Sequence, residues 1–149
     1  MIGVGGIGMS ALAQLYADHG AHVSGSDREE SPTTTLLQQK HIEVLIGQKA
    51  ENVPSDAELV VYTEAIPHDH SERVRAKELG LRTISYFGAL GEVSAGKRTI
   101  AVSGTHGKTT TTGMLAKVLR DAGASPTAIV GSIVRDFESN YLAGASDWF

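Results

Sequence analysis

A phosphate-loop motif constrains what this chain can fold into more than any other feature. In Thr99-Ile-Ala-Val-Ser-Gly-Thr-His-Gly-Lys-Thr-Thr-Thr-Thr112, a β-branched run leads into a Gly-x-x-Gly-Lys-Thr loop, and a helical pattern follows over residues 114–119. A strand, a glycine-rich loop and a helix in this order direct backbone N–H groups and a helix N-terminus at one anion. Val102 stands where the strict motif has its first glycine, so the loop is a shorter variant. The motif predicts an α/β fold that holds a nucleoside triphosphate.

The chemistry of such a loop assigns roles to its side chains. Lys108 can reach the terminal phosphates, and the Thr109 hydroxyl can ligate Mg²⁺. We therefore predict Lys108, Thr109 and His106 as catalytic residues, with Thr109 as the metal ligand. A solvated turn residue is the alternative for His106, and a helix cap is the alternative for Thr110. The predicted ATP-binding set is Gly104, Thr105, His106, Gly107, Lys108, Thr109 and Thr110.

A second glycine loop lies at the start of the chain. Gly3-Val-Gly-Gly-Ile-Gly8 satisfies G-x-G-x-x-G and opens a helical pattern, and Asp27 ends the next predicted strand. A carboxylate there could accept hydrogen bonds from a nucleoside. Three interpretations stay open: a nicotinamide or flavin dinucleotide, a nucleotide-sugar diphosphate, or glycines that only allow a tight turn. The phosphate loop downstream favours the second, because a sugar-nucleotide domain followed by an ATPase domain is a coherent ligase layout.

The rest of the pattern alternates short β-branched runs with helices, which is typical of parallel sheets with crossover helices. We predict helices over residues 9–19, 31–39, 71–79 and 87–93, and strands over 21–25, 42–46, 59–63 and 81–85. Small, flexible residues at 94–97 mark a boundary. The expected fold class is α/β, with a Rossmann-like parallel-sheet domain over residues 1–96 followed by the beginning of a P-loop ATPase domain over 97–149.

Both ends of the chain are expected to be cut. Only two residues precede Gly3, whereas a dinucleotide-type loop normally follows a strand of about five residues. A new strand is expected to start within 146–149. The second domain is therefore expected to be incomplete.

Composition narrows the remaining function classes. A net charge of −4 and a pI near 5.8 leave no electrostatic footprint for nucleic acid. The absence of cysteine excludes disulfides and thiol–metal sites and fits a reducing cytoplasm. No apolar run approaches the ~20 residues that a membrane span needs, and the start of the chain does not resemble a signal peptide. We expect a cytoplasmic protein without nucleic-acid or membrane partners.

Three further segments have residue types that suit a binding site or a charged surface. Thr63, Ala65 and Ile66 follow the carboxyl end of a predicted strand, where ligands of open α/β sheets bind. The cluster at 68–70 has the residue types of a metal site, but an exposed polar helix start explains it better. The basic run Arg73, Arg75 and Lys77 is expected to be a solvated helix face.

Three segments together resemble the Mur ligases of peptidoglycan synthesis: Ile2-Gly-Val-Gly-Gly-Ile-Gly-Met-Ser10, Val23-Ser-Gly-Ser-Asp27, and Val102-Ser-Gly-Thr-His-Gly-Lys-Thr-Thr-Thr-Thr112. With His106 in the phosphate loop, the chain is most similar to the member that adds L-alanine, and the murein-peptide recycling ligase is also similar. The other amino-acid-adding members usually carry Asn at this position. The resemblance runs over the whole chain but covers only the front part of such a ligase.

The resemblance implies a three-domain enzyme. In the family, ATP phosphorylates the lactyl carboxylate of UDP-N-acetylmuramate, and the amine of L-alanine attacks the acyl phosphate. The resemblance also implies that a further Mg²⁺-ligating glutamate and the adenine and amino-acid pockets lie beyond this chain, so the chain alone is not expected to ligate. A non-catalytic UDP-sugar-binding module and a nicotinamide-dependent oxidoreductase are the rival hypotheses. The predicted substrate-binding set is Gly3, Gly5, Gly6, Ile7, Gly8, Met9, Asp27, Thr63, Ala65 and Ile66.

Overall fold

The first residues of the chain form the middle of a parallel sheet. In the computed structural model, which describes all 149 residues, Ile2 bridges Ser26 on one side and Tyr62 on the other. Beyond them, β1 (Ser24–Asp27) pairs with β2 (Glu43–Ile46), and β3 (Val60–Tyr62) pairs with β4 (Thr83–Ser85), all parallel. The order is therefore β2, β1, the N-terminal segment, β3, β4. This is the strand order of a Rossmann half with two further strands, so the predicted fold class is confirmed.

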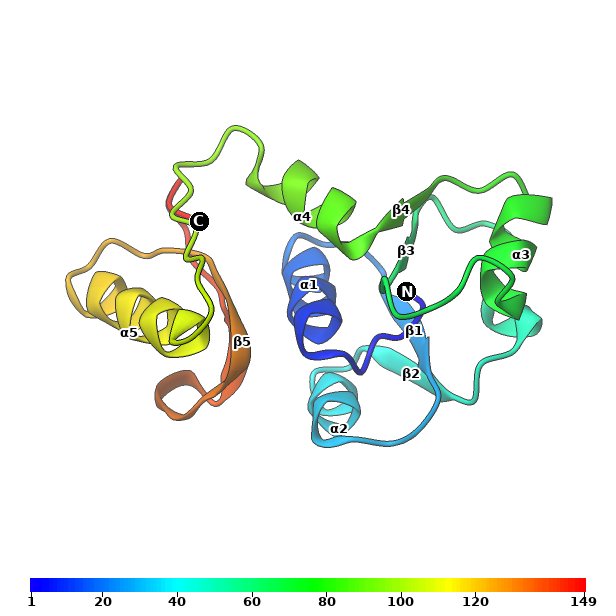
Figure 1. Cartoon of the computed structure of the whole chain (residues 1–149), viewed down its shortest axis with the longest axis horizontal. Helices are drawn as coiled ribbons and strands as arrows, with labels where there is room; N and C mark the ends of the chain where they lie inside the picture. Colours follow the sequence, from blue (N-terminus) through cyan, green and yellow to red (C-terminus); the bar gives the residue numbers. More distant parts are fainter.

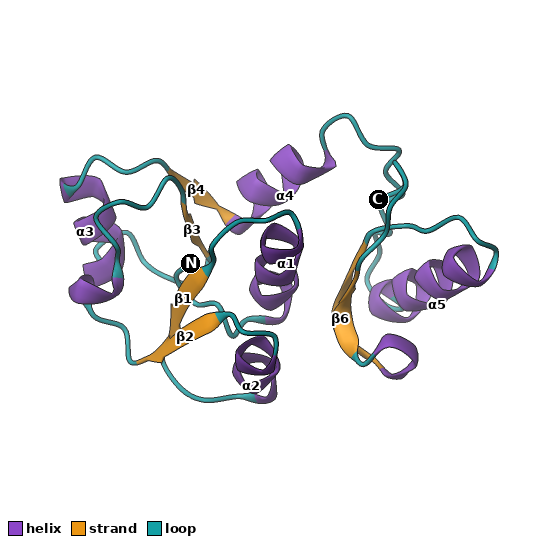
Figure 2. Ribbon diagram, turned by 180° about the vertical axis from the view of Figure 1, so that it is seen from behind, coloured by secondary structure: helices purple, strands orange, loops and turns teal.

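Helices cover both faces of this sheet (Figures 1 and 2). α1 (Ile7–Asp18), α2 (Pro32–Gln39) and α4 (Tyr86–Ser94) lie on one face. α3 (Ser71–Glu78) lies on the other face, beside a short 3-10 turn, η1 (Ala50–Asn52). Neighbouring strand residues point to opposite faces, so Val61 packs against α1 whereas Val60 packs against α3.

The local sequence explains where these helices start. Ser31 and Thr34 form a reciprocal capping box at α2, and Pro32 occupies the first turn, where a missing N–H costs nothing. The side chain of His70 accepts the Glu72 N–H at the start of α3. The predicted helices and strands of this part are present with small shifts at their ends.

The second part consists of α5 (Lys108–Asp121) and an antiparallel hairpin. β5 (Ala128–Val134) and β6 (Ser139–Leu142) pair across a short 3-10 turn, η2 (Arg135–Phe137). In both ribbon views the hairpin lies between α5 and α1. It therefore contacts the phosphate-loop helix on one side and the glycine-loop helix on the other.

The β-branched run at 99–102, predicted as the strand ahead of the phosphate loop, forms no strand, and this prediction was wrong. Arg98 bridges Trp148, and the Ile100 N–H donates to the Phe149 carbonyl (2.8 Å), so the run has a partner on one side only. A strand gains its stability from a ladder of neighbours, and a single short partner does not provide one. The predicted start of a strand at 146–149 corresponds to this partner.

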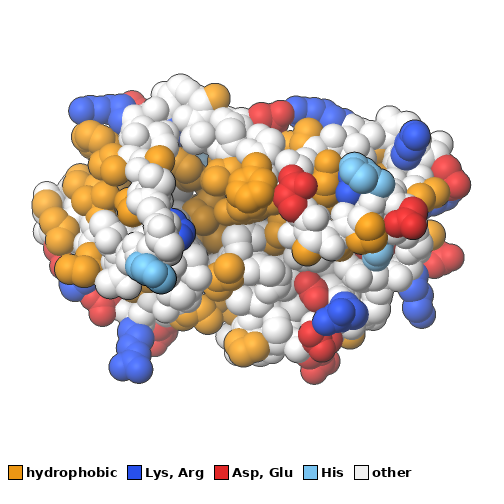
Figure 3. All heavy atoms as spheres, in the orientation of Figure 1, with side chains coloured by type: hydrophobic (Ala, Val, Ile, Leu, Met, Phe, Trp, Pro, Cys, Tyr) orange, Lys and Arg blue, Asp and Glu red, His pale blue; other side chains and the backbone are white.

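Apolar side chains gather on the surface around the second part (Figure 3). Met114 and Val118 of α5 are more than half exposed, at 64% and 61%. A mostly apolar hollow of about 670 Å³ lies between α4, the 99–102 segment and β5. No helix combines the length and the apolar character that crossing a bilayer would require.

Candidate functional site

The N-terminal glycine loop lies where the strand order of the sheet reverses. Gly3 has a positive φ of 78°, and a Cβ atom there would lie 2.6 Å from Cγ2 of Thr63. Only glycine allows both the conformation and the approach. The structure thus brings the glycine loop against the loop that follows β3, at the position where open α/β sheets bind ligands.

The start of α1 offers an anion site built from the backbone. The N–H groups of Ile7, Gly8 and Met9 have no acceptor, and the first bonded N–H of the helix is that of Ser10, which donates to Gly6 (2.8 Å). Gly6 and Ile7 are exposed, so this end of the helix is open to solvent. Free N–H groups and the helix dipole both favour a phosphate here.

Asp27 is turned onto the glycine loop. Its Oδ2 accepts the Gly5 N–H (2.7 Å) and its Oδ1 accepts the Arg28 N–H (2.8 Å). The hydroxyl of Thr33 donates to the Gly5 carbonyl. A Cβ atom on Gly5 would lie 2.8 Å from Oδ2 of Asp27, which explains the glycine. Asp27 therefore holds the loop in shape, and a contact from its remaining lone pairs to a nucleoside stays a prediction.

Several predicted substrate residues have side chains that face the core. Ile66 is 8% exposed and packs with Ile2 and Val60, and Met9 is 2% exposed and packs with Val61. Only their backbone atoms are available to a ligand. Ala65, in contrast, is exposed beside the glycine loop.

Gly8 is explained by packing. A Cβ atom on Gly8 would lie 2.7 Å from both Cζ and Oη of Tyr86, the first residue of α4. Burial raises the pKa of Tyr86, so its phenol stays protonated at neutral pH. The sequence prediction missed Tyr86, although the third glycine of such a motif is known to allow close packing.

The phosphate loop forms a second anion site at the start of α5. Gly107 caps the helix in the left-handed region (φ 76°), and Gly104 has a φ of 145°. The N–H groups of Lys108, Thr109 and Thr110 have no acceptor, and the first bonded N–H is that of Thr111 (2.9 Å to Gly107). The loop is folded and exposed. This geometry fits a triphosphate.

The side chains of the phosphate loop differ in how firmly they are held. The Lys108 ammonium lies over the loop and donates to the carbonyls of Gly104 (2.5 Å) and Thr105 (3.3 Å). His106 is exposed. Thr109 is half-buried, and a Cβ atom on Gly131 of β5 would lie 2.8 Å from its Oγ1. The strand therefore limits where the Thr109 hydroxyl can lie.

Whether a metal ion fits at the phosphate loop depends on the Thr109 side chain. No group of three or more His, Cys, Asp or Glu residues could hold a metal anywhere in the chain. A Mg²⁺ ion at Thr109 would take the hydroxyl together with phosphate and water oxygens, which is how Mg²⁺ is commonly held at nucleotides.

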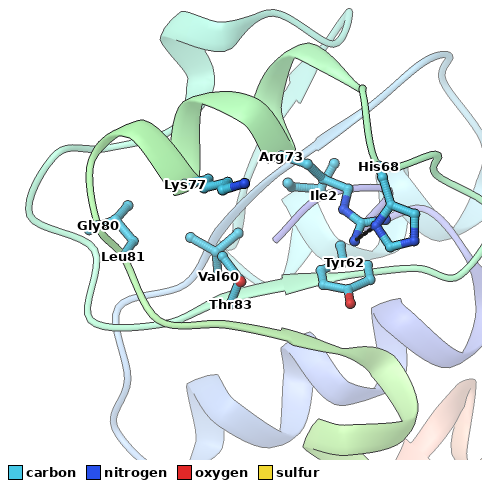
Figure 4. Close-up of a pocket in the computed structure, with 9 residues that line it drawn as sticks. All are labelled: Ile2, Val60, Tyr62, His68, Arg73, Lys77, Gly80, Leu81 and Thr83. Atoms are coloured by element: carbon cyan, nitrogen blue, oxygen red, sulfur yellow. Dashed lines mark hydrogen bonds between the residues drawn. The ribbon is translucent and has the colours of Figure 1, made fainter.

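A separate pocket of about 420 Å³ lies between α3 and strands β3 and β4 (Figure 4). The Arg73 guanidinium stacks on the Tyr62 ring at 3.7 Å and donates to the Ile66 carbonyl (2.8 Å). Figure 4 shows Arg73, His68 and Lys77 around this pocket. The prediction of a solvated basic face was therefore wrong for Arg73, because its planar group finds an aromatic face and a carbonyl under the helix.

Comparisons with known proteins bear on the whole chain. A model of the Mur ligase family, described as its catalytic domain, matches residues 1–98. A UDP-N-acetylmuramate–L-alanine ligase from Caldicellulosiruptor saccharolyticus is 45% identical over 149 residues, which are 99% of this chain and 32% of that protein. The ligase of the same name from Rubrobacter xylanophilus is 46% identical over 147 residues, 99% of this chain and 33% of the relative. This chain spans about a third of the length of these curated relatives.

Solved structures show the same likeness. The UDP-N-acetylmuramate–alanine ligase from Thermotoga maritima matches with a TM-score of 0.92 at 36% identity, over 96% of this chain and 34% of that one. The UDP-N-acetylmuramate:L-alanyl-gamma-D-glutamyl-meso-diaminopimelate ligase from Neisseria meningitides matches with a TM-score of 0.86 at 34% identity, over 94% of this chain and 44% of that one. Both matches extend over nearly all of this chain.

Proposed function

The chain belongs to the Mur ligase family, and on that premise we propose that it is the front part of an ATP-dependent ligase that joins L-alanine to the carboxylate of UDP-N-acetylmuramate. The observation that carries the proposal is the pair of helix starts with free N–H groups, at Ile7–Met9 and at Lys108–Thr110. One suits a sugar diphosphate and the other a triphosphate. We assign residues 1–96 to the sugar-nucleotide domain and 97–149 to the front of the ATP domain.

On the substrate side, the residues of this chain bind and orient. The N–H groups of Ile7, Gly8 and Met9 would hold the diphosphate, and half-buried Thr63 and exposed Ala65 would border the nucleoside. Asp27 keeps the loop open by holding the Gly5 N–H. The lactyl carboxylate is a poor electrophile. Its conversion to an acyl phosphate activates the carbonyl carbon, so that an amine can attack it.

On the ATP side, the chain supplies positive charge. Lys108 would exchange its two carbonyl partners for terminal phosphate oxygens. The free N–H groups of the loop would donate hydrogen bonds to the same negatively charged phosphates. Phosphoryl transfer depends mainly on such positioning and charge stabilisation. A Mg²⁺ ion on the Thr109 hydroxyl would neutralise part of the developing charge.

A second candidate is a ligase that joins a murein peptide, in place of L-alanine, to the same carboxylate. The similarity of the Neisseria protein, which matches over 94% of this chain, favours testing it. We propose that the residues that select the added amine lie outside those present here. We propose a cytoplasmic location, and we do not expect the chain on its own to ligate.

Calorimetry on the purified chain tests the proposal. We expect UDP-N-acetylmuramate to bind, and ATP with Mg²⁺ to bind separately. Lys108→Ala should abolish ATP binding without changing UDP-N-acetylmuramate binding, and Thr109→Val should remove the Mg²⁺ dependence of ATP affinity. Thr109→Ser, which keeps the hydroxyl, is the control. Binding of NADH in place of UDP-N-acetylmuramate would overturn the proposal in favour of an oxidoreductase.

A further inference from the structure

Four polar side chains lie buried between α1 and the hairpin. Ser10 and Gln14 come from α1, and Ser139 and Asn140 come from β6; none is more than 3% exposed. We refer to these four residues as the interface network. Buried polar groups cost free energy unless each one is paired, so their arrangement has to be specific.

The interface network is completely paired. Asn140 donates one amide hydrogen to Oγ of Ser10 (2.8 Å) and the other to the Ile7 carbonyl. Gln14 donates to Oδ1 of Asn140 (3.0 Å) and to the Ser10 carbonyl (3.1 Å), and it accepts from the Ser139 hydroxyl (2.9 Å). No buried side-chain nitrogen or oxygen lacks a partner. Such a network is directional and admits one relative placement of helix and strand.

The interface network ends at the proposed substrate site. Ile7 is the first residue of α1, and the Asn140 amide holds its carbonyl from the hairpin side, while its N–H stays free toward solvent. No other side chain outside α1 donates to this first turn. Asn140 therefore joins the first turn of α1 directly to the hairpin.

The hairpin also contacts the start of α5. β6 pairs with β5, and Gly131 of β5 lies against the Thr109 hydroxyl at the phosphate loop. A continuous set of contacts therefore runs from the first turn of α1, through Asn140 and the β5–β6 ladder, to Thr109. Figure 2 shows β6 between the two helices that carry the two proposed phosphate sites.

We propose that Asn140 is a positioning residue that fixes the first turn of α1 relative to the hairpin, and so keeps the two phosphate sites at one separation and orientation. This inference rests on the proposed function, in which a terminal phosphate has to meet a carboxylate at attack distance. A displacement of about 1 Å can cost on the order of 100-fold in rate. Apolar contacts in the same boundary are not directional and do not select such a geometry.

Distance measurements between two spin labels test the proposal without any ligand. The chain has no cysteine, so Gln38→Cys on α2 and Met114→Cys on α5 give two unique, exposed label positions, one in each part. We expect a narrow distance distribution for the otherwise unsubstituted chain and a broader, shifted one for Asn140→Ala. Leu15→Ala is the matched control, because Leu15 is 5% exposed, packs against Tyr141 in the same boundary and contributes no hydrogen bond to the interface network through its side chain.

The Leu15→Ala control distinguishes a change in the relative placement of the two parts from a general loss of stability. We expect Leu15→Ala to lower the unfolding midpoint in urea while its distance distribution stays narrow. A distribution for folded Asn140→Ala as narrow as that of the unsubstituted chain would overturn the proposal, and so would equal broadening by Leu15→Ala. If circular dichroism shows Asn140→Ala to be unfolded, Ser10→Ala, which removes one hydroxyl of the interface network, takes its place with the same two outcomes. Failure of the unsubstituted chain to bind UDP-N-acetylmuramate or ATP would overturn the proposed function alone and leave the distance result standing.

Discussion

The third glycine of the N-terminal loop gives the sharpest test of how this site is built. Gly8 lies in the first turn of α1, and a Cβ atom there would lie 2.7 Å from the Tyr86 ring. We interpret the missing side chain at Gly8 as a requirement of packing against α4, because any residue could offer the backbone N–H to a phosphate; the alternative is that a side chain there would block the ligand. Gly8→Ala, measured with and without Tyr86→Ala, distinguishes the two interpretations.

The expected magnitude follows from two opposing effects. Forcing a methyl group into a packed contact costs about 1–3 kcal/mol. Replacing a helical glycine by alanine gains about 0.5–1 kcal/mol. We therefore expect Gly8→Ala to destabilise the chain when Tyr86 is present and to stabilise it slightly in the Tyr86→Ala background. The coupling free energy between the two positions should be about 1–3 kcal/mol.

Urea unfolding of the four chains measures this coupling, and calorimetry with UDP-N-acetylmuramate measures binding. We expect the affinity of the double variant to match that of Tyr86→Ala alone. An equal loss of stability from Gly8→Ala in both backgrounds would refute the packing argument. A loss of affinity from Gly8→Ala that persists without the Tyr86 ring would show that the glycine serves the ligand.

Three further outcomes are expected. Asp27→Ala should lower the free energy of unfolding in urea by about 1.5 kcal/mol, the low end for a hydrogen bond to a charged acceptor. Asp27→Asn should lower it by less, because asparagine keeps an oxygen for the Gly5 N–H. Equal losses from the two variants would contradict this. Glu72→Ala should cost about 1–3 kcal/mol in urea unfolding for the buried Ser26 hydroxyl that it leaves unpaired (2.8 Å), whereas half-buried Asn52 keeps its bond to the Gly47 carbonyl. Gly131→Ala should weaken Mg²⁺-dependent ATP binding by displacing the Thr109 hydroxyl, whereas Gly91→Ala, in open space on α4, should leave calorimetric affinity unchanged.

Local pattern was sufficient for much of the fold. The glycine spacing at residues 3–8 and the Gly-Lys-Thr run predicted two helix starts, and both have free N–H groups. Residues 99–102 show the limit of this reasoning. Their composition suits a strand, but strand formation depends on neighbours, and only Trp148 and Phe149 are present on one side.

The missed features depend on contacts between distant segments. Ser10 and Gln14 are one helical turn apart, a spacing that suggests a polar stripe facing water. They are buried because Ser139 and Asn140, far along the chain, bring matching donors and acceptors. Arg73 likewise suggests a solvated face until the Tyr62 ring lies under it. Individual polar residues do not reveal such partners, because the partners are set by topology.

The central position of the N-terminal segment bears on biosynthesis. Ile2 pairs with Ser26 of β1 on one side and with Tyr62 of β3, much further along the chain, on the other. One edge of this short segment therefore stays unpaired until β3 has been made, and apolar Val4 beside it needs Leu37 and Ile42 to complete its core. Pairings between such distant residues form slowly and leave nascent chains open to misassociation. A stalled or prematurely terminated polypeptide that ends before β3 is therefore a natural client for chaperones.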